Sequence, residues 1–201
     1  MRSTRVIRLV KMSLLAALSI VLVFVSHFSI FPSAPFLEYD MADIPILIGT
    51  FMFGPWHGLI LTAAVSLLQW LLISPQSGWV GAVMHLFATG AFAIVAGLIY
   101  QRRHTIRGAI IALLCGSLAM IIAMVPMNIF ISPFFVMIMM GYESYSEAQT
   151  FYVDNFLLIS FIFNIIKALG NALLTFLLYK SAGKALNLIG SDKTPVRRGR
   201  A

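Results

Sequence analysis

Residues 160–171 read Ser-Phe-Ile-Phe-Asn-Ile-Ile-Lys-Ala-Leu-Gly-Asn, and aliphatic and aromatic residues continue on both sides of this stretch. Lys167 therefore lies in the middle of an apolar run long enough to cross a membrane. An ammonium group near the centre of a bilayer costs about 2.5–3.5 kcal/mol on insertion scales. Such a residue indicates a substrate site, a counter-ion or a transport pathway. The alternative is that Lys167 snorkels to the interface.

The composition of the whole chain agrees with a membrane location. Of its 201 residues, 60% are hydrophobic and 10% are charged, whereas soluble domains carry about 25% charged residues. The apolar runs are continuous rather than alternating, which favours membrane helices over barrel strands. A chain of this length forms one helical bundle without room for a soluble catalytic domain, so we predict that it is not an enzyme.

Hydropathy and helix breakers predict an all-α integral membrane fold, a six-helix bundle with a short second helix and an ordered extracellular first loop. The predicted helices are residues 7–30, 43–53, 55–74, 79–101, 106–131 and 155–189. We expect the segments 32–45 and 132–154 to cover one end of the bundle. Residues 1–190 would form the transmembrane substrate-binding domain, and residues 191–201 a basic, disordered cytoplasmic tail suited to the anionic headgroups of membrane lipid.

The distribution of charge predicts the topology. Basic residues gather at the N-terminus, between residues 102 and 107, and near the C-terminus, whereas all the acids except Asp192 lie in the segments 38–43 and 143–154. The positive-inside rule then places both termini in the cytoplasm of a multi-pass protein of the cell membrane. Because the net charge of +7 follows this topology, it does not indicate a nucleic acid partner.

Polar residues form a stripe along the last predicted helix. Residues three or four apart share a helix face, and Ser160, Asn164, Lys167 and Asn171 follow that spacing. Lysine offers only donors and asparagine offers both donors and an acceptor, so the stripe suits a planar neutral ligand that carries carbonyls and an N–H. Asn128 on the fifth helix could reach the same cavity. Hydrogen bonding between helices is the alternative for the asparagines.

Two further segments are candidates for binding. The loop acids Glu38, Asp40 and Asp43 are either solvated charges or acceptors for a polyol chain, and the neighbouring Leu37 and Tyr39 favour a lid that faces a ligand. On the first helix, small residues would let a partner helix approach closely, although internal packing is the alternative; they are Ser13, Ala16 and Ala17.

Motifs for catalysis, metal binding and ATP hydrolysis are missing from the sequence. The four histidines are scattered without ligand spacing, and no G-x-S-x-G elbow, Ser/His/Asp arrangement or G-x-x-x-x-G-K-[ST] loop is found. We therefore predict no catalytic residue, no metal site and no cofactor. Uptake driven by ATP would need the ATPase of another subunit.

Three parts of the chain, taken together, resemble one family. They are Pro35-Phe-Leu-Glu-Tyr-Asp-Met-Ala-Asp-Ile-Pro45 followed by Phe53-Gly-Pro55, Asn128-Ile-Phe130, and Phe163-Asn-Ile-Ile-Lys167 with Tyr179. In order and spacing they are similar to the riboflavin-specific S-component of energy-coupling factor (ECF) vitamin transporters.

This resemblance implies a membrane subunit that binds riboflavin with high affinity near its extracellular side, as transported substrate and not as cofactor. It implies that Asn128, Asn164 and Lys167 hydrogen-bond the flavin, under a lid formed by residues 37–43. The first helix would contact a transmembrane coupling subunit (EcfT), which two ATPase subunits drive. The family commonly has Ala-xxx-Ala at that contact, and here Ser13-xxx-Ala17 matches it. Gln69 and His85 stand where related chains carry asparagine, so their contact with ligand stays open.

Other functions remain as alternatives. The chain could be an S-component for another vitamin, or an autonomous ion-coupled vitamin carrier in which Lys167 and an acid such as Asp43 form a proton-sensitive pair. An intramembrane enzyme that acts on lipids through His85 or Asp43 is a further alternative, disfavoured because no paired acid and base motif is found.

Overall fold

The computed structural model describes residues 4–73 and 78–188, and within them the fold is helical with one small hairpin. The helices are α1 (Thr4–Ser26), α2 (Asp43–Phe53), α3 (Pro55–Leu72), α4 (Gly78–Arg102), α5 (Ile106–Phe130), α6 (Ser132–Met140) and α7 (Tyr145–Leu188). Between α1 and α2, strands β1 (Phe28–Ser29) and β2 (Glu38–Tyr39) pair antiparallel. The predicted tail 191–201 lies outside the described residues.

Five helices in the described ranges are long and apolar enough to cross a membrane: α1, α3, α4, α5 and the part of α7 between Tyr145 and Tyr179. The protein is therefore a multi-pass membrane protein. The shorter apolar α2 is buried along most of its length, with Ile46 and Leu47 fully inaccessible. It packs against α1, α3, α4 and α7, so it forms the centre of the bundle.

The prediction of six helices missed one element. Residues 132–154 were expected to be a cover, but they contain the helix α6 and the first turns of α7. Pro133 in the first turn of α6 and the left-handed Gly141 after it give this helix a start and an end. The early part of α7 is amphipathic, since Ala148 and Tyr152 are buried whereas the acids near them face outward, and hydropathy alone does not detect such a helix.

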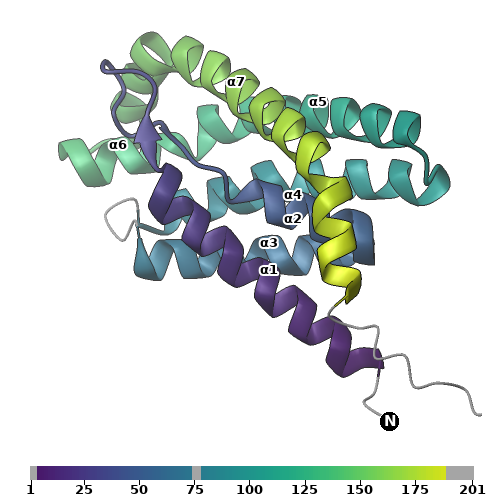
Figure 1. Ribbon diagram of the computed structural model, residues 1–201. Coiled ribbons are helices and arrows are strands. Elements are labelled where there is room, and N and C mark those ends of the chain that lie inside the picture. The colour runs from purple at the N-terminus through teal and green to yellow at the C-terminus, as the bar shows by residue number, and fades with distance from the viewer. Residues whose placement is uncertain (1–3, 74–77, 189–201) are drawn as a thin grey trace, which may run out of the picture.

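The two ends of the bundle differ in charge. In Figure 1 the start of α1, the α4–α5 turn and the last turns of α7 lie toward one end, and the β-hairpin and α6 toward the other. The first end carries basic residues such as Arg5 and Arg102, and the second carries the acids of the hairpin and of early α7. We call them the basic end and the acidic end.

Close packing at the α2–α3 junction depends on glycine. Gly54 has φ of +97°, which favours glycine, and it turns the chain into α3 at Pro55. Gly97 on α4 faces this turn, and a Cβ atom there would lie 2.8 Å from the Cα of Pro55. The junction therefore holds α2 and α3 directly against α4. Asp43, at the other end of α2, is buried among the helices at the acidic end.

Candidate functional site

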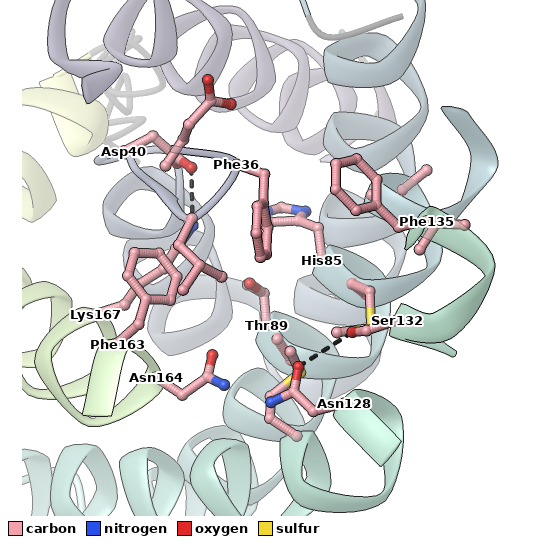
Figure 2. A pocket seen from close by; sticks show the side chains of 18 of the residues that line it. Phe36, Asp40, His85, Thr89, Asn128, Ser132, Phe135, Phe163, Asn164 and Lys167 are labelled. Carbon is pink, nitrogen blue, oxygen red and sulfur yellow. Dashed lines mark hydrogen bonds and ion pairs between the residues drawn. The ribbon is translucent and has the colours of Figure 1, made fainter. Parts of the chain in front are cut away.

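A cavity of about 180 Å³ opens among the helices at the acidic end, under the loop between α1 and α2 (Figure 2). Its apolar lining includes Phe36, Trp70, Phe135 and Phe163. Its polar lining comes from the loop between α1 and α2 and from helices α3 to α7: His27, Glu38, Asp40, Ser66, Gln69, His85, Thr89, Asn128, Ser132, Tyr152, Asn164 and Lys167. A concave site with aromatic walls and a few converging polar groups is the usual form of a small-molecule site.

Lys167 forms an ion pair with the loop above it. Its Nζ donates a hydrogen bond to Asp40 Oδ2 at 2.8 Å, and the two residues are 8% and 2% exposed. Removing one partner of such a buried pair would leave an uncompensated charge. The carrier hypothesis had suggested Asp43 as the acid, but the structure gives Lys167 a different partner. Because Asp40 follows β2 directly, the ion pair ties the loop to the middle of α7.

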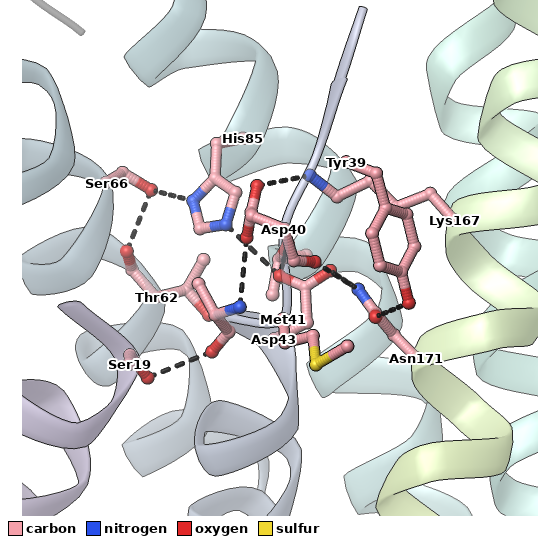
Figure 3. A network of polar contacts seen from close by, with 12 residues as sticks. Ser19, Tyr39, Asp40, Met41, Asp43, Thr62, Ser66, His85, Lys167 and Asn171 are labelled. Atoms are coloured by element: carbon pink, nitrogen blue, oxygen red, sulfur yellow. Dashed lines mark hydrogen bonds and ion pairs between the residues drawn. The ribbon is translucent and has the colours of Figure 1, made fainter. Parts of the chain in front are cut away.

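Asn171, one turn further along α7, also holds the loop. Its Nδ2 donates to Asp43 Oδ2 at 2.8 Å and to the Asp40 carbonyl at 3.4 Å, and its Oδ1 accepts from the Tyr39 hydroxyl at 2.7 Å (Figure 3). Burial raises the pKa of the Tyr39 phenol above its ordinary value, so this hydroxyl stays protonated and donates. Tyr39, Asp43 and Asn171 therefore position the loop and do not line the cavity.

The other two predicted asparagines do line the cavity. Asn128 Oδ1 accepts hydrogen bonds from Tyr152 at 3.2 Å and Ser132 at 3.3 Å, which fixes its amide plane. Asn164 makes no side-chain hydrogen bond with any residue in the described part of the chain. The predicted stripe on α7 thus divides into residues bound to the protein and one amide that is open to the cavity.

On the opposite side, α2, α3 and α4 form a hydrogen-bonded row. His85 Nδ1 lies 2.7 Å from Ser66 Oγ, and His85 Nε2 lies 3.1 Å from Asp43 Oδ1. Thr89 also donates to Asp43 Oδ1, at 2.6 Å. The sequence shows no Ser/His/Asp motif because the three residues lie far apart along it, and the fold brings them together.

This row does not have the geometry of a nucleophile. Ser66 is 4% exposed and its Oγ also donates to the Thr62 carbonyl at 2.8 Å. Ser66 lies within α3, where backbone N–H groups bond to the preceding turn and cannot form an oxyanion hole. The arrangement is a buried polar network rather than a catalytic triad.

Gln69 on α3 contributes an unpaired hydrogen-bond acceptor to the cavity wall. Its Oε1 is buried and has no hydrogen-bond partner among the described residues. Since most buried polar atoms are paired, an acceptor of this kind beside a cavity suits a ligand that donates. The sequence left Gln69 open, and it gave no signal at all for Ser66 or Thr89, because these positions converge only in the folded chain.

The mouth of the cavity is formed by the loop itself. His27 Nε2 lies 2.7 Å from Glu38 Oε2, and Glu38 is paired in register with Ser29 across the hairpin. Phe36 packs against Phe135 and Phe156, with ring centroids 5.1 Å apart in both pairs. Of the predicted lid, residues 37–43, Leu37, Glu38 and Asp40 line the cavity, whereas Tyr39 and Asp43 do not. We call residues 36–40 the lid.

Comparison with known proteins identifies the family. The sequence model described as "ECF transporter, substrate-specific component" matches residues 7–179. The chain belongs to this family. The family resemblance drawn from the loop, α5 and α7 motifs is confirmed.

Several relatives of this S-component have been named. It is 29% identical over 125 residues to the riboflavin transporter RibU of Lactococcus lactis subsp. cremoris (strain NZ9000), and the match spans 61% of each chain. It is also 29% identical to RibU of Staphylococcus aureus (strain TCH60), over 90% of this chain and 93% of that one. The riboflavin transporter FmnP of Bacillus subtilis (strain 168) is 29% identical over 62% of this chain and 65% of its own.

A solved structure shares the fold. It is described as "Structure and mechanism of the S component of a bacterial ECF transporter", and it superposes with a TM-score of 0.70 at 28% identity, covering 89% of this chain and 96% of the other. This S-component therefore shares its architecture with a member of the same family.

The small residues of α1 in this S-component face two directions. Ser13 and Ala17 are exposed on the outer surface of the bundle, whereas Ala16 is half-buried and packs against the α1–α2 core. Exposed neighbours on the same surface are apolar, among them Leu14 and Leu18. The predicted contact pair Ser13 and Ala17 is thus accessible, and Ala16 contributes to internal packing.

Proposed function

We propose that this chain is the high-affinity riboflavin-binding S-component of an ECF-type uptake transporter. The observation that carries the proposal is the convergence of Lys167, Asn164 and Asn128 on one aromatic-walled cavity, in a member of a family whose named relatives are riboflavin transporters. Together these residues supply donors and acceptors for the carbonyls and N–H of an isoalloxazine ring.

Each predicted residue takes a role in this proposal. Lys167 has three donors and uses one on Asp40, which leaves two for flavin oxygens. Asn164 and Asn128 meet the remaining polar edge of the ring. The carboxylates of Glu38 and Asp40, with Leu37 between the hairpin and the cavity, would receive the ribityl hydroxyls. Tyr39 and Asp43 act through the loop and not by direct contact.

Ligand entry requires the lid to move. The cavity of about 180 Å³ is smaller than the ~300–1,000 Å³ of usual ligand pockets. The polar contacts that hold the lid are the pairs Lys167–Asp40 and His27–Glu38 and the hydrogen bonds of Asn171 to Tyr39 and Asp40. Outward displacement of residues 36–40 would enlarge the cavity without disturbing α3, α4 or α5.

Transport would depend on other subunits. The exposed surface around Ser13 and Ala17 is proposed to contact the transmembrane coupling subunit (EcfT), which two ATPase subunits drive. The basic end would face the cytoplasm together with both termini, in accord with the positive-inside rule. No catalytic role is proposed, because the only Ser/His/Asp row among the described residues lacks an accessible nucleophile.

The visible spectrum of the protein purified in detergent tests the proposal. We expect a yellow protein with quenched flavin emission, and quenching of added riboflavin at sub-micromolar concentration. A colourless protein that leaves riboflavin emission unchanged would overturn the assignment. Competition by thiamine or another vitamin, instead of riboflavin, would point to a different S-component.

Uptake assays separate the subunit from an autonomous carrier. We expect riboflavin uptake by cells to stop when the ATPase subunits are removed while riboflavin binding persists. Uptake that continues without them would support the carrier, in which the buried Lys167–Asp40 pair would be the candidate for ion coupling.

A further inference from the structure

The imidazole of His85 is held at both nitrogens by protein groups, so it is not free to bond a ligand. Nδ1 faces Ser66 Oγ and Nε2 faces the Asp43 carboxylate (Figure 3). The side chain is 9% exposed and the ring lines the cavity. A histidine in this position can respond to a ligand without touching its polar groups.

The same positions of the non-hydrogen atoms allow two hydrogen-bonding arrangements around His85. With a neutral ring, Nε2–H donates to Asp43 and Ser66 donates its hydroxyl hydrogen to Nδ1. With a charged ring, both nitrogens donate, Ser66 accepts from Nδ1, and its hydroxyl hydrogen turns to the Thr62 carbonyl at 2.8 Å. Because each state has all its donors paired, neither carries the free-energy cost of a buried unsatisfied group. Rotation of one hydroxyl therefore prepares the site to accept a proton on Nδ1.

The surrounding charges determine which state the closed site favours. The ionisable groups around His85 comprise two carboxylates and one ammonium: Asp43 on α2, which bonds to Nε2, and Asp40 of the loop and Lys167 on α7, which line the cavity with His85. Ser66 on α3 and Thr89 on α4 are neutral. With a neutral ring the cluster has a net charge of −1, and with a protonated ring it is neutral.

We propose that His85 is a proton-binding site coupled to the ligand site, so that closure over riboflavin favours the uptake of a proton from solvent. A ligand that fills the cavity removes water from beside Asp40, Lys167 and His85, and exclusion of water raises the cost of an unbalanced buried charge. The bound state therefore favours the neutral cluster, which holds the proton. This inference rests on the proposed function, since riboflavin is the probe.

The sign of the pH dependence follows from linkage. At low pH the ring is protonated with or without ligand, and affinity is constant. As the pH rises, the free site loses its proton first, and affinity falls, by about threefold per pH unit at the steepest point for a tenfold coupling, until the bound site loses its proton too. We expect a total weakening of about tenfold, within the usual range of coupling between two sites.

Riboflavin titrations from about pH 5.5 to about pH 8.5, a range that brackets an unperturbed imidazole, test the proposal. They use the full chain in detergent and follow flavin quenching. Calorimetry of the wild type in two buffers of different ionisation enthalpy then counts the protons taken up, without any variant. Uptake of about half a proton where the affinity falls most steeply, as a tenfold coupling requires, supports the coupling together with the falling affinity. Binding with a flat pH profile and no proton uptake overturns it while the proposed function stands, whereas no binding at any pH overturns both.

Two variants assign the proton to His85. His85→Asn should flatten the profile, and Asp43→Asn should do the same, because the cluster is then neutral without the extra proton. His27→Asn is the matched control, since His27 is the other histidine that lines the cavity, and it should keep the pH dependence whatever its effect on affinity. A pH dependence that survives in both His85→Asn and Asp43→Asn, or that vanishes in His27→Asn, would overturn the assignment.

Discussion

The two walls of the cavity are built in different ways. The α7 wall presents Asn164 and Lys167 from a single helix face, where each residue is one turn from the next. The opposite wall presents Ser66 and His85 from two helices, and Asp43 on a third helix holds His85 from behind. The first wall offers hydrogen-bonding groups to the cavity, whereas the second bonds mainly to itself.

This difference separates binding from support. Side chains of the second wall have few free donors or acceptors, with Gln69 Oε1 as the exception. On α7 the roles are mixed: Asn164 is open to the cavity, Asn171 is bound to the loop, and Lys167 does both. Substitutions of residues open to the cavity should therefore mainly change riboflavin affinity, whereas substitutions of residues bonded to the protein should mainly change stability.

The largest effect is expected for Lys167→Met. This change leaves the Asp40 carboxylate buried without its partner, which costs about 3–5 kcal/mol of folding free energy. It also removes a charged donor from the ligand, which weakens riboflavin binding by about 1.5–3 kcal/mol. Thermal unfolding in detergent and flavin quenching measure the two effects separately.

The double variant Lys167→Met with Asp40→Asn distinguishes the two roles of the lysine. Asparagine at position 40 keeps an acceptor for the Ala42 backbone N–H, which Asp40 Oδ1 now binds at 2.9 Å. We expect this second change to restore most of the thermal stability and none of the affinity. Recovery of affinity together with stability would show that Lys167 only supports the lid.

A smaller effect is expected for Asn171→Leu. It removes the hydrogen-bond partner of the Tyr39 hydroxyl and of one Asp43 oxygen. We therefore expect a loss of about 1–3 kcal/mol in the free energy of unfolding. Asn164→Leu is the matched control on the same helix face, and it should lower riboflavin affinity by about 1 kcal/mol with little change in unfolding temperature. Equal loss of stability in both variants would contradict the division of roles along α7.

The contrast between the walls also explains what the sequence could predict. Helical spacing groups residues on one helix, so the stripe from Ser160 to Asn171 and its link to a cavity could be predicted before the fold was known. Hydropathy located α2 to α5 to within a few residues, because their apolar runs end at Gly, Pro or basic residues. The family resemblance rested on the same ordered motifs.

Contacts between distant segments could not be predicted in this way. Which acid meets Lys167 depends on how the loop folds over α7, and Asp40 and Asp43 are equivalent by charge alone. The row from Asp43 through His85 to Ser66 forms because α2, α3 and α4 pack against one another. The spacing of residues within one helix does not show which side chains of other helices they will meet.

The smallest effect, and the sharpest test of the second wall, is expected for Gln69→Met. Methionine keeps the length of the side chain and removes the buried unpaired Oε1, so the free protein should be unchanged or slightly more stable. If the bound ligand donates to this oxygen, riboflavin affinity should fall by about 1 kcal/mol. Flavin quenching and thermal unfolding measure both quantities.

Flavin analogues show which donor Gln69 would meet. A flavin methylated at the imide nitrogen lacks the ring donor, and lumiflavin lacks the ribityl hydroxyls. The analogue without the relevant donor should bind wild type and Gln69→Met with the same affinity, whereas the other should keep the difference. A loss that is equal for riboflavin and both analogues would mean that Gln69 only shapes the wall, and then all direct hydrogen bonding to the ligand would come from α7, α5 and the lid.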